Sequence, residues 1–236
     1  MKYLSKIFLF SFTLLLCVST NAQTKGTMID PRDGQVYKTV EIGNRIWMAQ
    51  NLNYESTDSI FHKKFIEPVP VLNQFNVYMP DSYCYGDVLI NCEKYGRLYH
   101  YDAAMKVCPL GWHLPDSLES ISLLSYLQKA AGNDKYQLYE NLIPGGSSGF
   151  DLLCPGFGFG LFTKLHGRYS ALGLGQYLWI TSANKTVETK KSVYKSRYDR
   201  SNILVFYKSR KNFVKCQIHD NNNYYLFSVR CIKNEE

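Results

Sequence analysis

The cysteines constrain this chain more than any other feature of its sequence. The chain has 236 residues and 7 cysteines, of which only Cys17 lies in an apolar N-terminal segment. The others are Cys84, Cys92, Cys108, Cys154, Cys216 and Cys231. No C-x-x-C spacing occurs and no histidine lies at ligand spacing from a cysteine pair, which argues against a zinc site. An even number of cysteines in an exported chain would predict disulfides, with 15 possible pairings.

The N-terminal residues predict export. Two lysines precede an apolar run over residues 7–18, and small residues follow it up to Ala22. This order is typical of a secretory signal peptide, so we expect residues 1–22 to be removed. A buried core helix or a retained anchor is the alternative, but the run is shorter than the roughly twenty apolar residues that span a bilayer. A lipoprotein signal acylated at Cys17 is weaker, because the bulky Leu16 precedes that cysteine.

Composition places the rest of the chain among globular proteins. Hydrophobic residues make up 45%, charged residues 20% and aromatic residues 15%. These fractions exclude a disordered tail, a collagen-like repeat and a polytopic membrane protein. The 19 tyrosines and 13 phenylalanines favour strands over a helical bundle. The formal charge of +7 favours acidic partners.

Period-two alternation predicts β-structure at both ends of the chain. Residues 35–42 and 45–50 form a predicted β-hairpin around a turn at 43–44. Residues 144–175 are rich in glycine and predict bends and close backbone packing. From Tyr177 onward the chain is interpreted as short β-segments separated by polar turns.

The strongest helix signal covers residues 116–131. Asp116 can cap this helix, Glu119 completes a capping-box spacing, and Gly132 ends it. Its predicted buried stripe consists of Leu118, Ile121, Leu124 and Leu127. A second, short helix is predicted over residues 99–107. A hairpin followed by helices and then by strands predicts the α+β class.

Several sequence blocks resemble a known family in the order in which they occur. They are residues 30–43, 47–54, 83–86, 92–99, 101–105, 108–115 and 227–231. Together they closely resemble the Fibrobacter major paralogous domain family over nearly all of residues 23–236, which we expect to form one domain. The resemblance implies a C-type-lectin-like fold, shared with formylglycine-generating enzymes. It has an N-terminal β-hairpin, two helices and an antiparallel β region rich in glycine and turns.

The chain departs from the family pattern in a surface insertion at about residues 55–82 and in two additional cysteines. Spacing and the resemblance together imply three disulfides. One closes a small loop around a polar turn, and one joins the residue before the long helix to the last strand, since the fold brings these ends together. The two additional cysteines are left to pair with each other. The implied pairs are Cys84–Cys92, Cys108–Cys231 and Cys154–Cys216.

Motifs for enzyme chemistry are missing from the sequence. The glycine-rich runs match neither a phosphate loop nor a dinucleotide-binding motif, and no Gly-x-Ser-x-Gly elbow occurs. His113 and Asp102 are a candidate base and acid, but we interpret both as structural. Cys216 and Cys231 are too far apart to match the reactive cysteine pair of formylglycine-generating enzymes. The triplets with which sugar-binding C-type lectins hold calcium do not occur either, so we expect no enzyme, no cofactor and no metal.

Positive charge concentrates in residues 185–215, where 10 lysines and arginines face 2 acidic residues. Basic residues recur there at spacing two, so each pair would share one face of a strand, with tyrosines between them. The predicted ligand-binding residues are Lys195, Arg197, Lys208, Arg210, Tyr198 and Tyr207. The alternative is a solvated sheet face whose lysines discourage edge pairing.

These features predict an exported, non-catalytic binding or cell-surface interaction module in the periplasm, on the cell surface or outside the cell. Its expected partner is an anionic polysaccharide or another envelope component, and not an intracellular nucleic acid. A structural envelope component and, last, an enzyme related to formylglycine-generating oxidases are the alternatives. No transmembrane helix is expected after signal cleavage. The triplet Asp58, Ser59 and Ile60 resembles a short acceptor for O-glycans within the insertion.

Overall fold

The computed structural model describes residues 23–56, 80–159, 169–182, 201–208, 214–221 and 225–235. The predicted signal peptide, most of the predicted insertion and the predicted glycan acceptor lie outside these ranges. The strands are β1 (Lys25–Ile29), β2 (Val36–Ile42), β3 (Arg45–Met48), β4 (Ser82–Tyr83), β5 (Leu98–Tyr99), β6 (Trp112–His113), β7 (Phe157–Phe159), β8 (Tyr169–Ser170), β9 (Gly175–Ile180), β10 (Ser201–Lys208), β11 (Val214–Asn221), β12 (Tyr225–Ser228) and β13 (Ile232–Lys233). The helices are α1 (Leu89–Tyr95), α2 (Tyr101–Ala104), α3 (Ser117–Ala130) and α4 (Lys135–Leu142), with a short 3-10 helix η2 (Tyr85–Asp87).

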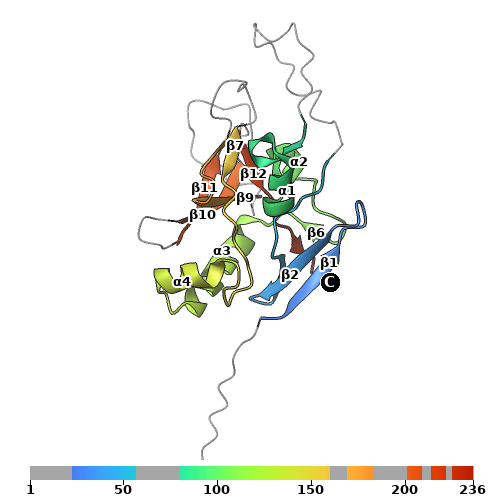
Figure 1. Ribbon diagram of the computed structural model, residues 1–236. Coiled ribbons are helices and arrows are strands. Elements are labelled where there is room, and N and C mark those ends of the chain that lie inside the picture. The colour runs from blue at the N-terminus through green and yellow to red at the C-terminus, as the bar shows by residue number, and fades with distance from the viewer. Residues whose placement is uncertain are drawn as a thin grey trace, which may run out of the picture.

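The strands form two sheets with helices beside them (Figure 1). A five-stranded sheet has the order β1-β2-β3-β13-β6. An eight-stranded sheet has the main path β11-β10-β9-β12-β5-β4, from which β7 and β8 branch at β12. The predicted α+β class is therefore confirmed. One step of the expected antiparallel region is parallel, because β12 runs alongside β9 through Ser228 and Leu178.

The predicted hairpin is confirmed as β2 and β3, which pair from Ile42 and Arg45 outward. Gly43 and Asn44 take φ values of 59° and 65°. Positive φ at both central residues is the mark of the type I′ turn, whose twist matches that of the flanking strands. A strand not predicted from the sequence, β1, adds to the outer edge of β2.

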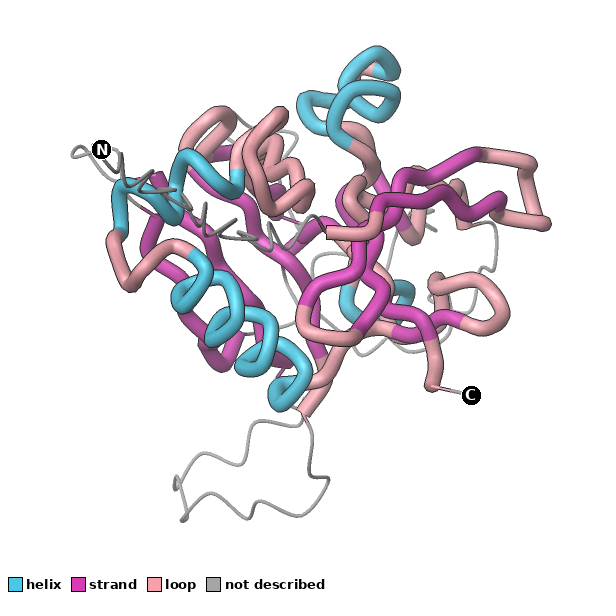
Figure 2. Tube along the Cα trace, turned by 90° about the horizontal axis from the view of Figure 1, so that it is seen from below, coloured by secondary structure: helices cyan, strands magenta, loops and turns pink. Residues whose placement is uncertain are grey.

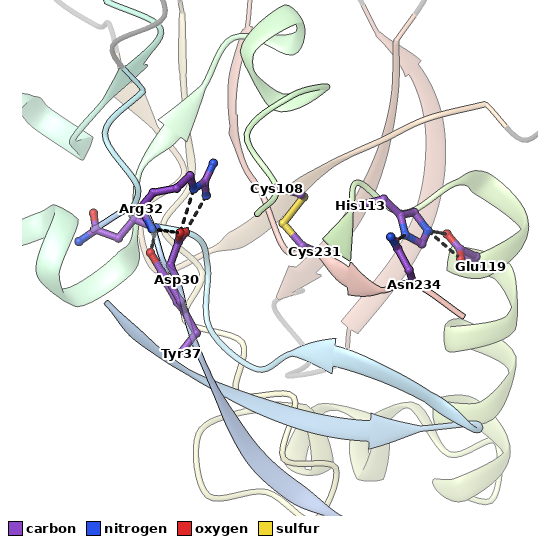
Figure 3. The surroundings of a disulfide bond; sticks show 9 residues. Asp30, Arg32, Tyr37, Cys108, His113, Glu119, Cys231 and Asn234 are labelled. Atoms are coloured by element: carbon purple, nitrogen blue, oxygen red, sulfur yellow. Dashed lines mark hydrogen bonds and ion pairs between the residues drawn. A yellow bond between two sulfur atoms is a disulfide. The ribbon is translucent and has the colours of Figure 1, made fainter. Parts of the chain in front are cut away.

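The turn between β1 and β2 is closed by an ion pair. Asp30 is fully buried and accepts hydrogen bonds from the Nε and Nη2 atoms of Arg32 at 2.8 and 2.6 Å (Figure 3). The Arg32 guanidinium also lies 3.7 Å above the centre of the Tyr54 ring. A bidentate arginine–carboxylate pair stacked on an aromatic ring fixes the turn relative to the segment after β3.

We predict that acid weakens this turn through Asp30. Burial alone would raise the pKa of Asp30, but its hydrogen bonds to Arg32 and the charge of Arg32 outweigh burial and leave the pKa below its ordinary value. Such a carboxylate stabilises the fold above its unfolded pKa of about 3.9, and this contribution is lost as pH falls through the folded pKa. In urea unfolding, the stability advantage of the wild type over Asp30→Asn should therefore shrink as pH falls below about 4. An advantage independent of pH would contradict this role.

Helix α3 has the predicted limits but only half of the predicted buried stripe. The capping box is complete, because Asp116 accepts from the Glu119 amide and Glu119 accepts from the Asp116 amide. Leu118 and Ile121, expected in the core, are 61% and 50% exposed. The other two predicted members do reach the core, since Leu127 is buried and Leu124 packs against it, and they are joined there by Ser120 and Leu123. The four predicted residues are each three positions apart. In a helix of 3.6 residues per turn, each step of three positions rotates the side chain by about 60°, so the first and last of the four face opposite sides.

One core lies between α3, α4 and one face of the large sheet (Figure 2). Helix α4 was not predicted, although Asp134 caps it by accepting from the amides of Tyr136 and Gln137. Leu138 and Leu142, four residues apart, bury its inner side. They belong to the same cluster as residues of α3, β9 and β10 such as Leu127, Leu178, Ile180, Leu204 and Phe206.

A second core lies on the other face of the same strands. Trp179 of β9, Val205 of β10 and Phe227 of β12 belong to it, together with Tyr99 of β5 and Ala104 of α2. Because side chains alternate along a strand, β9 and β10 contribute to both cores.

Two of the three predicted disulfides are confirmed. Cys84 and Cys92 are bonded across η2 and the start of α1, and Cys108 is bonded to Cys231 over a separation of 123 residues (Figure 3). Cys231 directly precedes β13, which pairs with both β3 and β6. The long-range bond therefore ties the segment before β6 to the residue before β13, the neighbouring strand of the five-stranded sheet.

The predicted Cys154–Cys216 disulfide is wrong, because the Cys154 thiol is free. Gly156, two residues after Cys154, forms a bridge with Gln176 of β9. Gln176 is opposite Phe206 of β10, and Phe206 is opposite Cys216 of β11. Neighbouring strands are about 4.8 Å apart, whereas bonded cysteines need Cα atoms within about 7 Å. Two strands therefore stand between the segments that the bond would have joined.

Candidate functional site

The predicted ligand-binding residues are only partly covered by the structure. Lys195, Arg197, Tyr198 and Arg210 lie outside the described residues. Tyr207 and Lys208 end β10.

Tyr207 and Lys208 lie on opposite faces of β10. The Lys208 Nζ atom lies 5.3 Å from the centre of the Tyr139 ring in α4, on the helix-covered side of the sheet. A hydrogen bond to Tyr139 raises the pKa of Lys208, so the ammonium stays charged. Tyr207 is 40% exposed on the side away from α4. One ligand surface therefore cannot use both side chains at once.

The face that carries Tyr207 holds a group of partly exposed aromatic rings, which we call the aromatic surface. Its members come from four strands that lie side by side, β7, β9, β10 and β12 (Figure 1). They are Phe157, Phe159, Tyr177, Tyr207 and Tyr225. Buried Phe227 contacts three of these rings, those of Phe157, Tyr177 and Tyr225.

The rings of the aromatic surface contact one another closely. The centre of the Phe157 ring lies 5.0 Å from that of Tyr177 and 5.8 Å from that of Tyr225. Phe227 stacks nearly parallel to Tyr225 at 5.5 Å and to Tyr177 at 5.6 Å. Contacts of this kind add about 0.5–1.5 kcal/mol per pair beyond burial, so the rings are held in fixed positions before any ligand arrives.

Two glycines make room for this arrangement. Gly156 has a φ of 74°, and a Cβ atom there would lie 2.1 Å from the Ser170 carbonyl oxygen. It lets the chain turn so that β7 enters between β9 and β12 at this end of the sheet. A Cβ atom on Gly175 would lie 2.5 Å from the Tyr177 ring. The Tyr177 ring therefore covers Gly175, which is the residue opposite Tyr207.

The Tyr177 hydroxyl group of the aromatic surface is neutral at physiological pH. Burial raises the pKa of Tyr177, and the neighbouring Tyr207 raises it further. The surface therefore offers flat apolar rings together with tyrosine hydroxyl groups that can donate and accept hydrogen bonds. This combination suits a ligand that has both apolar faces and hydroxyl groups.

The candidate base and acid from the sequence are His113 and Asp102, and Cys154 is a free thiol. Both His113 ring nitrogens are hydrogen-bonded, and Asp102 lies in the first turn of α2, where a carboxylate favours the helix dipole. Burial raises the pKa of the Cys154 thiol, although Arg230 and Lys208 lower it in part. A nucleophilic cysteine needs a lowered pKa, so this thiol is not activated. Within the described ranges, no group of three or more His, Cys, Asp or Glu side chains could hold a metal ion.

The sequence interpretation missed four of the five members of the aromatic surface. Phe157 and Phe159 lie in the glycine-rich run that was interpreted as bends. Tyr225 lies just before the sequence block 227–231 that resembles the family. The alternation Phe-Gly-Phe and Tyr-Leu-Phe at 157–159 and 225–227 was a usable signal, because alternate residues of a strand share a face. That these strands are neighbours could not be derived from it.

Comparison with known proteins places the chain in a family. The model of the family described as the Fibrobacter succinogenes major domain matches residues 40–233, in agreement with the resemblance of the sequence blocks. No curated protein and no solved structure matches the chain, so the lectin-like form of the fold stays a prediction. Across the described residues, no helix is long and apolar enough to cross a membrane.

Proposed function

The chain belongs to the Fibrobacter succinogenes major domain family, and on that premise we propose that it is an exported, non-catalytic module that binds a polysaccharide through the aromatic surface. Export is supported by the signal-like residues 1–22 and is consistent with the two disulfides. The absence of catalysis is supported by the raised pKa of Cys154 and by the missing enzyme motifs.

The observation that carries the proposal is the set of partly exposed rings across β7, β9, β10 and β12. Aromatic rings that only fill a core are buried. Tyr207 is instead 40% exposed, and the other four rings of the aromatic surface are each partly exposed. Pyranose rings present flat C–H faces that pack on aromatic rings and hydroxyls that bond to tyrosine. A polysaccharide therefore matches both chemical properties of the surface.

We predict that Tyr207→Ala weakens polysaccharide binding by about three- to tenfold, the size of one lost ring contact. Affinity gel electrophoresis against neutral and acidic polysaccharides measures the change. Tyr136→Ala is the matched control, because Tyr136 is 56% exposed on α4 and lies outside the aromatic surface. Equal loss in both variants, or no binding of the wild type to any polysaccharide, would contradict the proposal.

A second ligand class is favoured by the charge of residues 185–215, with 10 basic and 2 acidic residues. If that segment supplies the binding energy, the ligand is an anionic polymer and affinity falls steeply between low and physiological salt. Binding through the aromatic surface should change little over the same range. The same electrophoresis at two salt concentrations separates the two.

A further inference from the structure

Strand β1 is an edge strand of the five-stranded sheet. Within the described residues it pairs only with β2, and its other side faces outward (Figure 1). Two backbone hydrogen bonds show which of its residues bond toward β2. The Glu41 amide donates to the Thr24 carbonyl at 2.9 Å, just before β1. The Asp30 amide donates to the Gln35 carbonyl at 2.8 Å, just after β1, in the same register.

These two bonds determine which backbone groups of β1 point away from the sheet. Alternate residues of an antiparallel strand direct both their N–H and their C=O toward the same neighbour. Thr24 and Asp30 bond toward β2, so the even-numbered residues between them do so as well. The odd-numbered residues therefore direct their N–H and C=O groups outward. They are Lys25, Thr27 and Ile29.

Little in the sequence of β1 protects this outer edge against pairing with another strand. Natural edge strands are shielded by proline, by a bulge, by charged residues or by being very short. β1 has five residues in unbroken register with β2, contains no proline, and carries its one charge at the first position, Lys25. At its other end, Ile29 and its cross-strand partner Val36 are 65% and 60% exposed. A strand laid along β1 would pair the outward backbone groups and cover part of Ile29.

We infer that the outer edge of β1 is a self-association surface, on which the β1 strands of two copies of this chain pair antiparallel across a two-fold axis at Thr27. In this register Thr27 lies opposite Thr27 of the second copy, and Lys25 of each copy lies opposite Ile29 of the other. The outward N–H and C=O groups of all three residues then have partners. Two five-stranded sheets become one continuous sheet, and because both copies use the same edge, the assembly closes at two.

The charges at the two ends of the edge favour a second copy in this orientation. Lys25 lies at one end of β1, and the turn at the other end carries the exposed Asp33. Arg32 in that turn is already paired with Asp30, so Asp33 leaves the turn with a net negative charge. Antiparallel pairing brings the lysine of each copy to the turn end of the other copy, where opposite charges attract. The aliphatic part of Lys25 then covers the Ile29 side chain opposite it.

Hydrogen exchange of the full chain at low and high protein concentration tests this surface residue by residue. In a single copy the Lys25, Thr27 and Ile29 amides point away from β2, so they should exchange fast in dilute solution. At a concentration where about nine-tenths of the chains are dimeric, their exchange should slow about tenfold, because only the remaining single copies exchange. The Gly26 and Met28 amides bond toward β2 and are the internal reference, which should change little.

Two variants at Thr27 separate edge pairing from association elsewhere on the molecule. Proline at this position removes an outward N–H at the two-fold axis and no bond to β2, a position at which an edge strand tolerates proline. Thr27→Pro should therefore abolish the dimer in analytical ultracentrifugation. Thr27→Val keeps the N–H and is the matched control, which should dimerise like the wild type. Protected Gly26 and Met28 amides in Thr27→Pro show that β1 still pairs with β2.

Three results would overturn the inference. The first is a wild type that stays monomeric up to about 1 mM. The second is a Thr27→Pro protein that dimerises as well as Thr27→Val, because association would then use another surface. The third is protection of the Lys25, Thr27 and Ile29 amides at every concentration, because another part of the same chain would then cover the edge.

Discussion

Replacing Cys108 and Cys231 together by serine should lower the free energy of unfolding by about 4–5 kcal/mol. In the chain-entropy view, a bond over 123 residues removes many conformations from the unfolded chain and so stabilises the fold strongly. The native structure also depends on this bond locally, because Cys231 is fully buried and directly precedes β13 between β3 and β6. Urea unfolding followed by tryptophan fluorescence measures the loss.

The matched control is the double serine variant at Cys84 and Cys92, whose bond spans only 8 residues. The same relation assigns that bond about 2.5 kcal/mol, roughly half of the effect at Cys108 and Cys231. If the two double variants lost equal stability, loop length would not be the cause. An unchanged stability after loss of the long-range bond would show that the residual structure of the unfolded chain outweighs the cross-link.

Arg230→Met should destabilise the fold by about 2–4 kcal/mol. Arg230 is 1% exposed and donates to the Asn51 side-chain oxygen at 2.8 Å, to the Phe150 carbonyl and to the Asp151 carbonyl at 2.9 Å. Its guanidinium also lies 4.5 Å from the centre of the Phe150 ring. Burial lowers the pKa of Arg230 to about 9, so it remains charged at neutral pH.

The loss in Arg230→Met comes from the acceptors that remain. Each buried acceptor without a donor costs about 1–3 kcal/mol, while the desolvation cost of the guanidinium is no longer incurred. Arg230→Lys should lose nearly as much, since an ammonium cannot reproduce the fork of donors. Arg45→Met serves as the control, because its partners Glu119 and Glu235 are 16% and 75% exposed, so its loss leaves no fully buried charge unpaired and should cost less. An Arg230→Met protein as stable as the wild type would mean that the core closes over the site without strain.

Residues close together in the sequence were predicted best. The β2–β3 hairpin depends on two turn residues, Gly43 and Asn44, whose φ preferences are local. The limits of α3 depend on Asp116 and Glu119, which contact each other directly. The Cys84–Cys92 bond spans a single short loop. In each case the interacting groups are within about eight residues of each other. The short connecting segment leaves them few possible relative positions, so the contact can be predicted locally.

Predictions failed where a distant part of the chain decides the result. The buried face of α3 is set by where the large sheet lies, so Ser120 is buried and Leu118 is not. The Cys154–Cys216 pair failed because β9 and β10 separate the two segments. An even cysteine count says nothing about such strand order.

The sequence by itself determined the α+β class, the family, the hairpin and the helix that Asp116 caps, because these follow from local preferences and from the order of the sequence blocks. Only the tertiary structure decided that β7 enters between β9 and β12 and so places Phe157 and Phe159 beside Tyr177 and Tyr225. It also decided that Tyr207 and Lys208 serve opposite faces of the sheet. Strand neighbours are chosen by the burial of whole faces, a free energy that depends on all the packed elements together and that no single segment of the sequence contains.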